Sequence, residues 1–192
     1  MTARRPDAAT RRAQLLDAAD AVFTEFGVNA ALDLIVERAA VGRATLYRQF
    51  PDRQAILQAL LERSAERLAD KAHSLGDAPD AFFTLLAYLA DRTVRSPALS
   101  DYWRTASLND PRFAAARQQA WNAFGPALAR AKAQGLVRDD IQLRDISLLS
   151  GMLGAALRGD TDAARRRLAR QALELLRRGL RPDAPPTQGD SA

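Results

Sequence analysis

Hydrophobic residues recur three or four positions apart along most of the chain, and Gly, Pro, Asp or Ser residues interrupt these runs at helix-length intervals. Runs of Val, Ile and Thr, which would favour strands, are missing. The pattern therefore predicts an all-α protein with about nine helices. The expected helices cover residues 8–26, 32–39, 43–50, 53–73, 79–94, 97–107, 111–134, 143–158 and 161–180.

Punctuating residues indicate where several of these helices begin, bend or end. Gly27 follows the first helix and suits the left-handed conformation that terminates many helices, and Asp52 precedes the fourth helix as its expected N-cap. Pro126 lies inside the segment 111–134, where its missing backbone N–H predicts a kink.

The two short helices on either side of Ala40-Val41-Gly42 are the most informative feature, because a helix, a tight turn and a second helix make a helix-turn-helix unit. Ile35, Leu46 and Phe50 can point inward and hold the two helices at a fixed angle. The remaining side chains of the second helix include no acid, and their donors and methyl groups suit bases and phosphates in a DNA groove. They are Arg43, Ala44, Thr45, Tyr47, Arg48 and Gln49.

A resemblance to a known family is carried by residues 33–57, which read DLIVERAAVGRATLYRQFPDRQAIL. This stretch resembles the DNA-binding signature of the tetracycline-repressor (TetR/AcrR) family, with Thr-Leu-Tyr in the recognition helix and Phe50 closing it. The resemblance implies a homodimeric transcriptional regulator, usually a repressor that a small ligand in the C-terminal domain releases from a pseudo-palindromic operator.

The same resemblance assigns a role to individual side chains. It implies base contacts at or near Arg43, Ala44 and Tyr47, and phosphate contacts for Thr45, Gln49 and Arg53, while Arg48 could make either contact. If Arg43 reads a base, Arg43→Ala should cost about 1 to 3 kcal/mol of binding free energy, whereas Arg53→Ala should weaken binding to all sequences alike.

The stretch departs from the family pattern at three positions. Ala40 stands where the family prefers Gly, and a non-Gly residue in a left-handed turn costs roughly 1 to 2 kcal/mol. Gly42 replaces the usual Ser at the N-cap of the recognition helix, and Ala31 replaces the common Thr before the helix that precedes it. These changes affect the geometry and stability of the turn.

The helix pattern and the resemblance together divide the chain into three parts. Residues 1–53 form the expected helix-turn-helix domain, residues 54–181 a ligand-binding and dimerisation domain, and residues 182–192 a disordered tail rich in Pro, Gly and Asp. The first part carries eight Arg and seven acidic residues, a net charge of +1, so attraction to DNA depends on where the charges lie. Arg11 and Arg12 are expected to contact phosphates, while Arg4 and Arg5 suit either a DNA-binding arm or a disordered terminus.

The last two helices are the dimer interface that the resemblance implies, as a four-helix bundle across a two-fold axis. Small and apolar residues lie on them at helical spacing. The expected contacts are Leu149, Gly151, Leu153, Gly154, Leu168, Ala172, Leu175 and Leu176. Residues 158–181 also carry eight Arg and three acids, which suits either a solvated face on a packed helix or, alternatively, a helix on a membrane surface.

Aromatic residues gather in the middle helices, where an effector cavity would be lined by apolar side chains with a few polar groups. The candidate ligand contacts are Trp103, Trp121, Phe124, Phe83 and Met152. His73, at the end of the fourth helix, is interpreted as a surface or cap residue.

Composition excludes several other classes of protein. The chain has no Cys and one His among 192 residues, so it has no ligand set for zinc fingers or iron–sulfur clusters and no thiol nucleophile. No phosphate-binding Gly loop or Ser/His/Asp set is found, so we expect neither an enzyme, nor a cofactor, nor a metal site. A net charge of +5 favours anionic partners, and no apolar run is long enough to cross a membrane, so we expect a cytoplasmic protein. The alternative is a helical adaptor that keeps a helix-turn-helix without binding specific DNA.

Overall fold

Residues 8–105 and 110–182 are described by a computed structural model, and this part of the chain is helical without any strand. The prediction of an all-α fold is confirmed. The α-helices are α1 (Ala8–Phe26), α2 (Leu32–Arg38), α3 (Arg43–Gln49), α4 (Arg53–Leu75), α5 (Ala81–Arg95), α6 (Pro97–Thr105), α7 (Ala114–Asn122), α8 (Gly125–Ala133), α9 (Asp145–Leu153) and α10 (Asp162–Gly179). Two 3₁₀ helices, η1 (Pro111–Phe113) and η2 (Gly154–Arg158), join them. The expected arm with Arg4 and Arg5, and residues 183–192 of the expected tail, lie outside the described residues.

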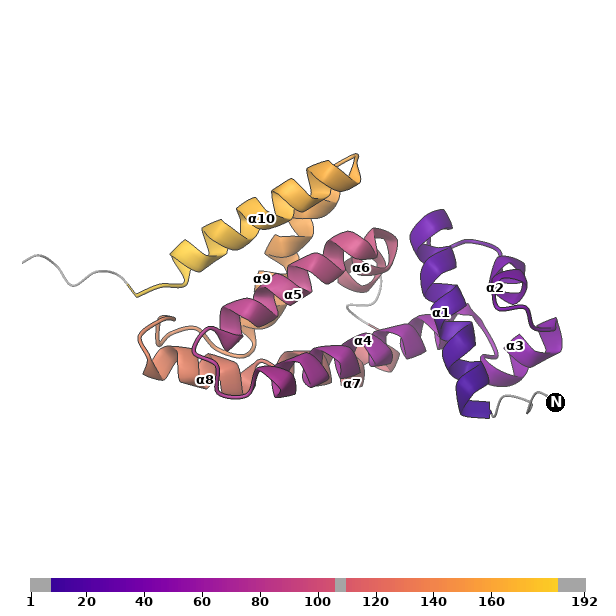
Figure 1. The fold of residues 1–192 in the computed structure, drawn as a ribbon, viewed down its shortest axis with the longest axis horizontal. Helices are drawn as coiled ribbons and strands as arrows, with labels where there is room; N and C mark the ends of the chain where they lie inside the picture. Colours follow the sequence, from indigo (N-terminus) through magenta and orange to yellow (C-terminus); the bar gives the residue numbers. More distant parts are fainter. Residues whose placement is uncertain (1–7, 106–109, 183–192) are drawn as a thin grey trace, which may run out of the picture.

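Helices α1, α2 and α3 form a unit at one end of an elongated molecule (Figure 1). Helix α4 leads out of this unit and runs along the remaining helices, where it packs against α7 and α5. Helix α10 packs against α5 and η2 on the other side. The long α4 is therefore the main connection between the two ends of the molecule.

Two hydrophobic clusters match this arrangement. The first holds α1–α3 together with the beginning of α4, and it continues to Leu99, Phe113 and Ala116 in later helices. The second lies among α5, α8, α9 and α10 and the second half of α4. Helix α4 therefore contributes to both clusters and packs against the elements at each end of the molecule.

Two expected helices are divided in the structure. The predicted kink in residues 111–134 is a complete break at Ala123 and Phe124, because Pro126 has no N–H to donate and its ring would clash with the carbonyl four residues before it. The expected helix 143–158 is α-helical only to Leu153 and continues as the tighter η2.

The turn between α2 and α3 contains the predicted strain. Ala40 has φ +50°, the one non-Gly residue of the described chain with a positive φ. Asp52 caps α4 by accepting a hydrogen bond from the Ala55 N–H at 2.8 Å, whereas the N-caps Ala31 and Gly42 offer no side chain to α2 and α3. The helix-turn-helix unit thus forms with less local support than its family pattern provides.

Replacing Ala40 with Gly is expected to raise the free energy of unfolding by about 1 kcal/mol, because Gly adopts a positive φ without the Cβ clash. Ala40 is exposed, so removing its methyl group loses no packing. Chemical denaturation followed by circular dichroism measures the change. The matched variant is Ala39→Gly, where φ is −81° and Gly should instead lower stability; equal effects at both positions would contradict the assignment of strain to Ala40.

Candidate nucleic-acid interface and internal cavity

Helix α3 presents one side to the interior and the other to solvent. Leu46 and the adjoining Phe50 are buried, and with Ile35 of α2 they belong to the first hydrophobic cluster. The opposite side is exposed and contains four of the residues predicted to contact DNA: Arg43, Ala44, Tyr47 and Arg48. The predicted outer surface of the helix is therefore free of cover by the described chain.

Two arginines on this surface have neighbours within the unit. Arg43 Nη2 lies 2.6 Å from Asp33 Oδ2, in a pair whose side chains are 71% and 48% exposed. Arg48 donates to Thr45 Oγ1 at 3.1 Å. Both contacts are at the surface and cost little to exchange for a phosphate or a base edge.

Arg12 and Arg53, for which phosphate contacts were expected, both make contacts within the N-terminal unit. The Arg12 guanidinium stacks 4.4 Å from the centre of the Phe50 ring and donates to the Gln49 carbonyl at 3.3 Å. Arg53 donates to the Val28 carbonyl at 2.6 Å. Both side chains therefore hold the unit together, and phosphate contacts by them and by the half-buried Arg11 stay a prediction.

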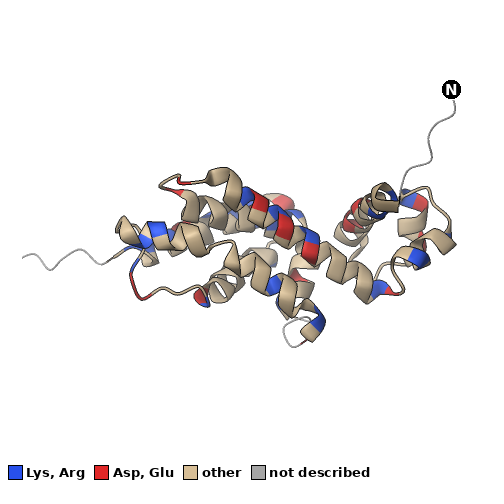
Figure 2. Cartoon of the chain, turned by 90° about the horizontal axis from the view of Figure 1, so that it is seen from below, with Lys and Arg blue, Asp and Glu red and all other residues tan. Residues whose placement is uncertain are grey.

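Basic and acidic positions alternate along the helices of this unit (Figure 2). The mixture agrees with the net charge of +1 counted for residues 1–53. Helix α3 itself contains Arg43 and Arg48 and no acidic residue. Helix α3 therefore carries a local excess of positive charge on an exposed side.

A cavity of about 540 Å³ lies between α4, α5, α6, α7 and α9. Its apolar wall includes Tyr88, Leu89, Trp103 and Trp121, so the two tryptophans of the chain both line it. The volume is in the range of cavities that take small organic molecules. The sequence predicted Trp103 and Trp121 as ligand contacts, and the structure brings them to this one site.

The other three candidate ligand contacts do not line the cavity. Phe124 is fully buried in the second cluster, where its ring lies edge-on to Phe82 with 6.1 Å between centroids. Phe83 stacks under the guanidinium of Arg177 at 5.0 Å, and Met152 is half exposed on α9. A pattern of aromatic residues could not separate wall from core here, because both are apolar at helical spacing.

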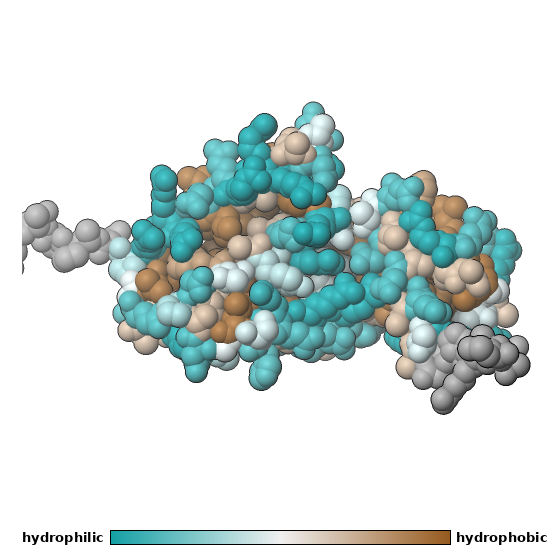
Figure 3. Space-filling view, viewed as in Figure 1, coloured by the Kyte–Doolittle hydropathy of each residue, from teal (hydrophilic) through white to brown (hydrophobic). Residues whose placement is uncertain are grey.

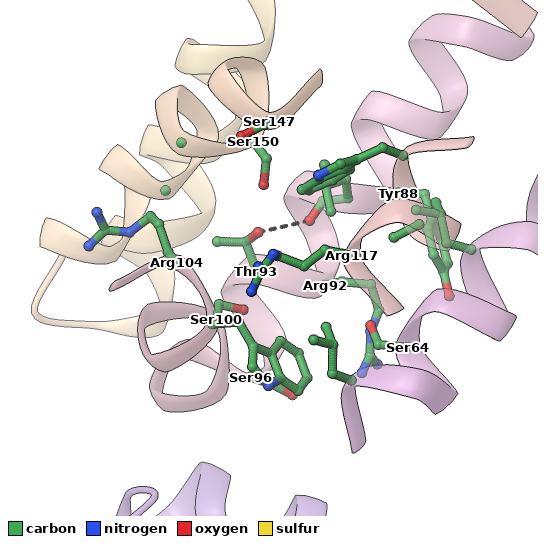
Figure 4. A pocket seen from close by; sticks show the side chains of 18 of the residues that line it. Ser64, Tyr88, Arg92, Thr93, Ser96, Ser100, Arg104, Arg117, Ser147 and Ser150 are labelled. Atoms are coloured by element: carbon green, nitrogen blue, oxygen red, sulfur yellow. Dashed lines mark hydrogen bonds between the residues drawn. The ribbon is translucent and has the colours of Figure 1, made fainter. Parts of the chain in front are cut away.

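The polar residues of the cavity were not predicted. They are four arginines, Arg92, Arg104, Arg117 and Arg144, together with hydroxyl side chains such as Ser64, Ser100 and Ser147. Figure 4 shows Arg117 reaching into the cavity beside Thr93, whose hydroxyl donates to the Leu89 carbonyl at 2.9 Å. Gly154 makes room for Arg104, since a Cβ on Gly154 would lie 2.7 Å from the Arg104 Cδ.

A group of charged residues around Asp20 joins α1 to α4 and α5, and we call it the Asp20 cluster. Asp20 Oδ2 lies 3.4 Å from Arg63, 3.9 Å from Arg92 and 4.0 Å from Arg67, while Ser96 donates to Asp20 Oδ1 at 3.4 Å. Arg92 and Ser96 also line the cavity. The same two side chains therefore contact the N-terminal unit and form part of the cavity wall.

The expected dimer contacts fall into three groups. Leu149, Leu153 and Leu176 are buried in the core of this chain, and Gly151 and Gly154 line the cavity. Leu168 and Ala172 are half buried, and Leu175 is 63% exposed. Leu148 at 65% and Met152 at 50% are exposed nearby on α9. Hydrophobic surface is visible beside α10 among polar side chains (Figure 3).

No group of three or more His, Asp or Glu side chains is placed to hold a metal ion within residues 8–105 and 110–182. In the same part of the chain, none of the helices has the length and apolar character needed to span a membrane.

The sequence matches two protein families. Residues 15–60 match the family described as bacterial regulatory proteins, tetR family, and residues 77–182 match the C-terminal domain of SbtR-like transcriptional regulators. A comparison with curated proteins finds no match.

Solved structures of transcription regulators are similar over nearly the whole chain. A TetR transcriptional regulator from Streptomyces coelicolor is 30% identical with a TM-score of 0.67, and the alignment covers 90% of this chain and 99% of that one. A TetR regulator from Mycobacterium vanbaalenii is 27% identical with a TM-score of 0.66, covering 92% and 98%. An ArpA-like gamma-butyrolactone receptor is 25% identical with a TM-score of 0.58, covering 92% and 91%.

Proposed function

Because the chain belongs to the TetR family of bacterial transcription regulators, we propose that it binds a pseudo-palindromic operator as a homodimer and represses transcription until a small molecule enters the cavity. The observation that carries the proposal is the uncovered outer side of α3, with Arg43, Tyr47 and Arg48 exposed over a buried Leu46. A recognition helix needs this combination of a fixed inner side and a free outer side.

The contacts proposed for DNA are those that the resemblance to the family implies. Arg43, Ala44 and Tyr47 are assigned to base edges, and Thr45, Gln49 and Arg53 to phosphates, with Arg48 beside them. Arg11 and Arg12, at the start of α1, are assigned to the flanking backbone. In a dimer the two recognition helices would occupy successive major grooves about 34 to 36 Å apart, which requires a pseudo-palindromic operator.

We assign residues 1–53 to DNA binding and residues 54–181 to effector binding and dimerisation. The proposed dimer face is formed by the exposed Leu148, Met152 and Leu175, with the half-buried Leu168 and Ala172 beside them. Leu149, Leu153 and Leu176 support this face from within. A two-fold interface between α9 and α10 of both copies would cover apolar surface that is otherwise in water.

The Asp20 cluster supports an effector response. Arg92 and Ser96 line the cavity and also contact Asp20 of α1, so a ligand that moves them changes how α1 is held against α4 and α5. Such a ligand acts only if it binds one arrangement more tightly than the other. The structural relative named as a gamma-butyrolactone receptor supports a small-molecule effector for this fold.

A gel shift with the DNA upstream of the protein's own gene tests the proposal. A regulator is expected to bind a specific site with a dissociation constant of about 10⁻⁸ to 10⁻¹¹ M at physiological salt, and the affinity should fall steeply as salt rises. Footprinting of operators selected from genomic DNA would then locate the two half-sites. Weak binding that is indifferent to sequence would instead favour a helical adaptor that keeps the helix-turn-helix.

Asp33→Asn is expected to raise affinity for DNA by up to about 5-fold at low salt, because it releases Arg43 from an exposed ion pair and removes a negative charge near the phosphates. Fluorescence anisotropy at two salt concentrations measures the gain, which should shrink as salt increases. Glu25→Gln is the matched control, since it breaks an exposed pair between α1 and Arg38 of α2 that includes no residue of α3. An equal gain from Glu25→Gln would mean that net charge alone is responsible.

A further inference from the structure

The charged groups of the cavity are all basic. Arg92, Arg104, Arg117 and Arg144 reach it from four different segments, and none of the described residues that line it is acidic. A recess lined by one sign of charge, with apolar walls beside it, concentrates the opposite charge. Guanidinium groups also recognise carboxylate, sulfonate or phosphate oxygens with directed N–H donors.

The acidic partners of Arg92 and Arg104 lie outside the lining of the cavity. Asp101 pairs with Arg104 at 2.6 Å, and Asp20 lies 3.9 Å from Arg92. The side chain of Arg112, hydrogen-bonded to Asp110, lowers the pKa of that carboxyl, and Arg117 adds a smaller effect in the same direction. None of these carboxylates is among the described residues that line the cavity, so the lining itself carries no negative group.

Hydroxyl groups in the cavity add hydrogen-bond donors that also suit an anion. The Thr93 hydroxyl already donates its hydrogen bond to the Leu89 carbonyl. Three serines, Ser100, Ser147 and Ser150, line the cavity from α6 and α9, and each can donate one hydrogen bond. In Figure 4 the Arg117 side chain lies in the middle of this polar part. The centre of the cavity is therefore rich in donors.

The remaining wall defines the rest of the ligand. Trp103, Trp121, Tyr88, Leu89 and Leu68 offer flat and apolar surface within the same 540 Å³. Aromatic side chains bind apolar bodies and stack on rings. The walls thus fit a compact hydrocarbon or aromatic body attached to the charged group.

We propose that the effector is an amphipathic organic anion, whose acidic group is held by Arg117 with the cavity's serine hydroxyls and whose apolar or aromatic body lies against the two tryptophans. This inference rests on the proposed function of the cavity as an effector site. It goes beyond that function by naming the chemical class of the ligand and the side chain that selects it.

Because the chain has only Trp103 and Trp121, energy transfer from tryptophan reports on the cavity directly. The probes are 1-anilinonaphthalene-8-sulfonate and N-phenyl-1-naphthylamine, which share the same rings and differ in the sulfonate. The full-length protein is titrated with each probe without DNA. The sulfonate is expected to bind at least about 10-fold more tightly, the effect of a charge-assisted hydrogen bond.

Arg117→Gln is expected to remove most of this preference while leaving the affinity of the neutral probe within about 2-fold. Arg138→Gln is the control, because Arg138 is a half-buried arginine paired with Asp140 and does not line the cavity. Circular dichroism checks that both variants fold, and Arg117→Lys, which keeps the charge, should restore part of the preference. A preference that survives Arg117→Gln, equal binding of the two probes, or no binding of the sulfonate each overturns the proposal.

A gel shift on the same protein separates this inference from the proposed function. If the protein binds the sulfonate selectively but binds no specific DNA, the anion site is supported and the proposed function as a regulator is refuted. Tight operator binding by a protein that treats the two probes alike would refute the anion site alone.

Discussion

Leu175→Glu is expected to lower the affinity of the protein for its operator by at least about 100-fold, because two linked recognition helices bind with an avidity that each alone lacks. Leu175 is 63% exposed on α10, so the monomer loses little packing when it is replaced. In a two-fold interface the substitution places two carboxylates in apolar surroundings, where an unpaired charge is strongly unfavourable. Light scattering measures the mass of the particle, and anisotropy measures operator affinity.

The neighbouring leucine provides the matched comparison. Leu176 is buried, so Leu176→Ala should lower the free energy of unfolding by about 2 to 5 kcal/mol. Gln118→Glu, which makes the same charge change as Leu175→Glu at an exposed position of α7, should alter neither the mass nor the affinity strongly. A Leu175→Glu protein that is folded, dimeric and tightly bound to DNA would place the dimer face elsewhere.

Phe50→Ala is expected to destabilise the helix-turn-helix unit by about 3 to 5 kcal/mol and to abolish specific DNA binding. Phe50 is 2% exposed and closes α3 against the first cluster, and its ring also carries the Arg12 guanidinium at 4.4 Å. The substitution removes the ring from the core and takes away the stacking partner of Arg12 at the same time. Hydrogen exchange of α3 and operator affinity measure the two effects.

Phe26→Ala tests whether the effect belongs to the buried position. Phe26 is 53% exposed at the end of α1, so losing its ring should change stability by less than about 1 kcal/mol. If Phe50→Ala left α3 protected from hydrogen exchange and left the operator affinity unchanged, the recognition helix would be held by contacts other than this ring.

Local signals in the sequence were enough to predict the helices and the inner side of the helix-turn-helix. Ile35, Leu46 and Phe50 are apolar at helical spacing and all three are buried, and the strain expected at Ala40 is present as a positive φ. These features depend on neighbours within a few residues, which periodicity and turn chemistry describe well.

Contacts between distant segments could not be predicted in this way. Arg12 meets the Gln49 carbonyl across 37 residues, and Arg53 meets the Val28 carbonyl across 25. In the sequence, an arginine that holds the unit together cannot be distinguished from an arginine that contacts a phosphate. The roles of Arg12 and Arg53 therefore emerge only when the helices are assembled.

The polar lining of the cavity could not be predicted from the sequence for the same reason. Its four arginines are spread over α5, α6, α7 and the residue before α9, and each looks like part of a solvated helix surface in the sequence. The tryptophans were selected only as two of several aromatic candidates in the middle helices, where such residues gather. Phe124 could not be distinguished from them, since its burial depends on Phe82 of another helix.

Arg92 belongs to the cavity wall and to the Asp20 cluster at once. Under the proposed function, this position predicts that DNA and effector are mutual antagonists. An anion that attracts the guanidinium weakens its hold on Asp20, and reciprocity requires the operator to lower the anion's affinity by the same factor. Saturating operator DNA should therefore expel bound 1-anilinonaphthalene-8-sulfonate, and an unchanged sulfonate affinity would contradict this linkage. A protein bound to its operator would then need a higher effector concentration than the free protein does. The fraction of protein bound to DNA would therefore set the effector concentration at which induction begins.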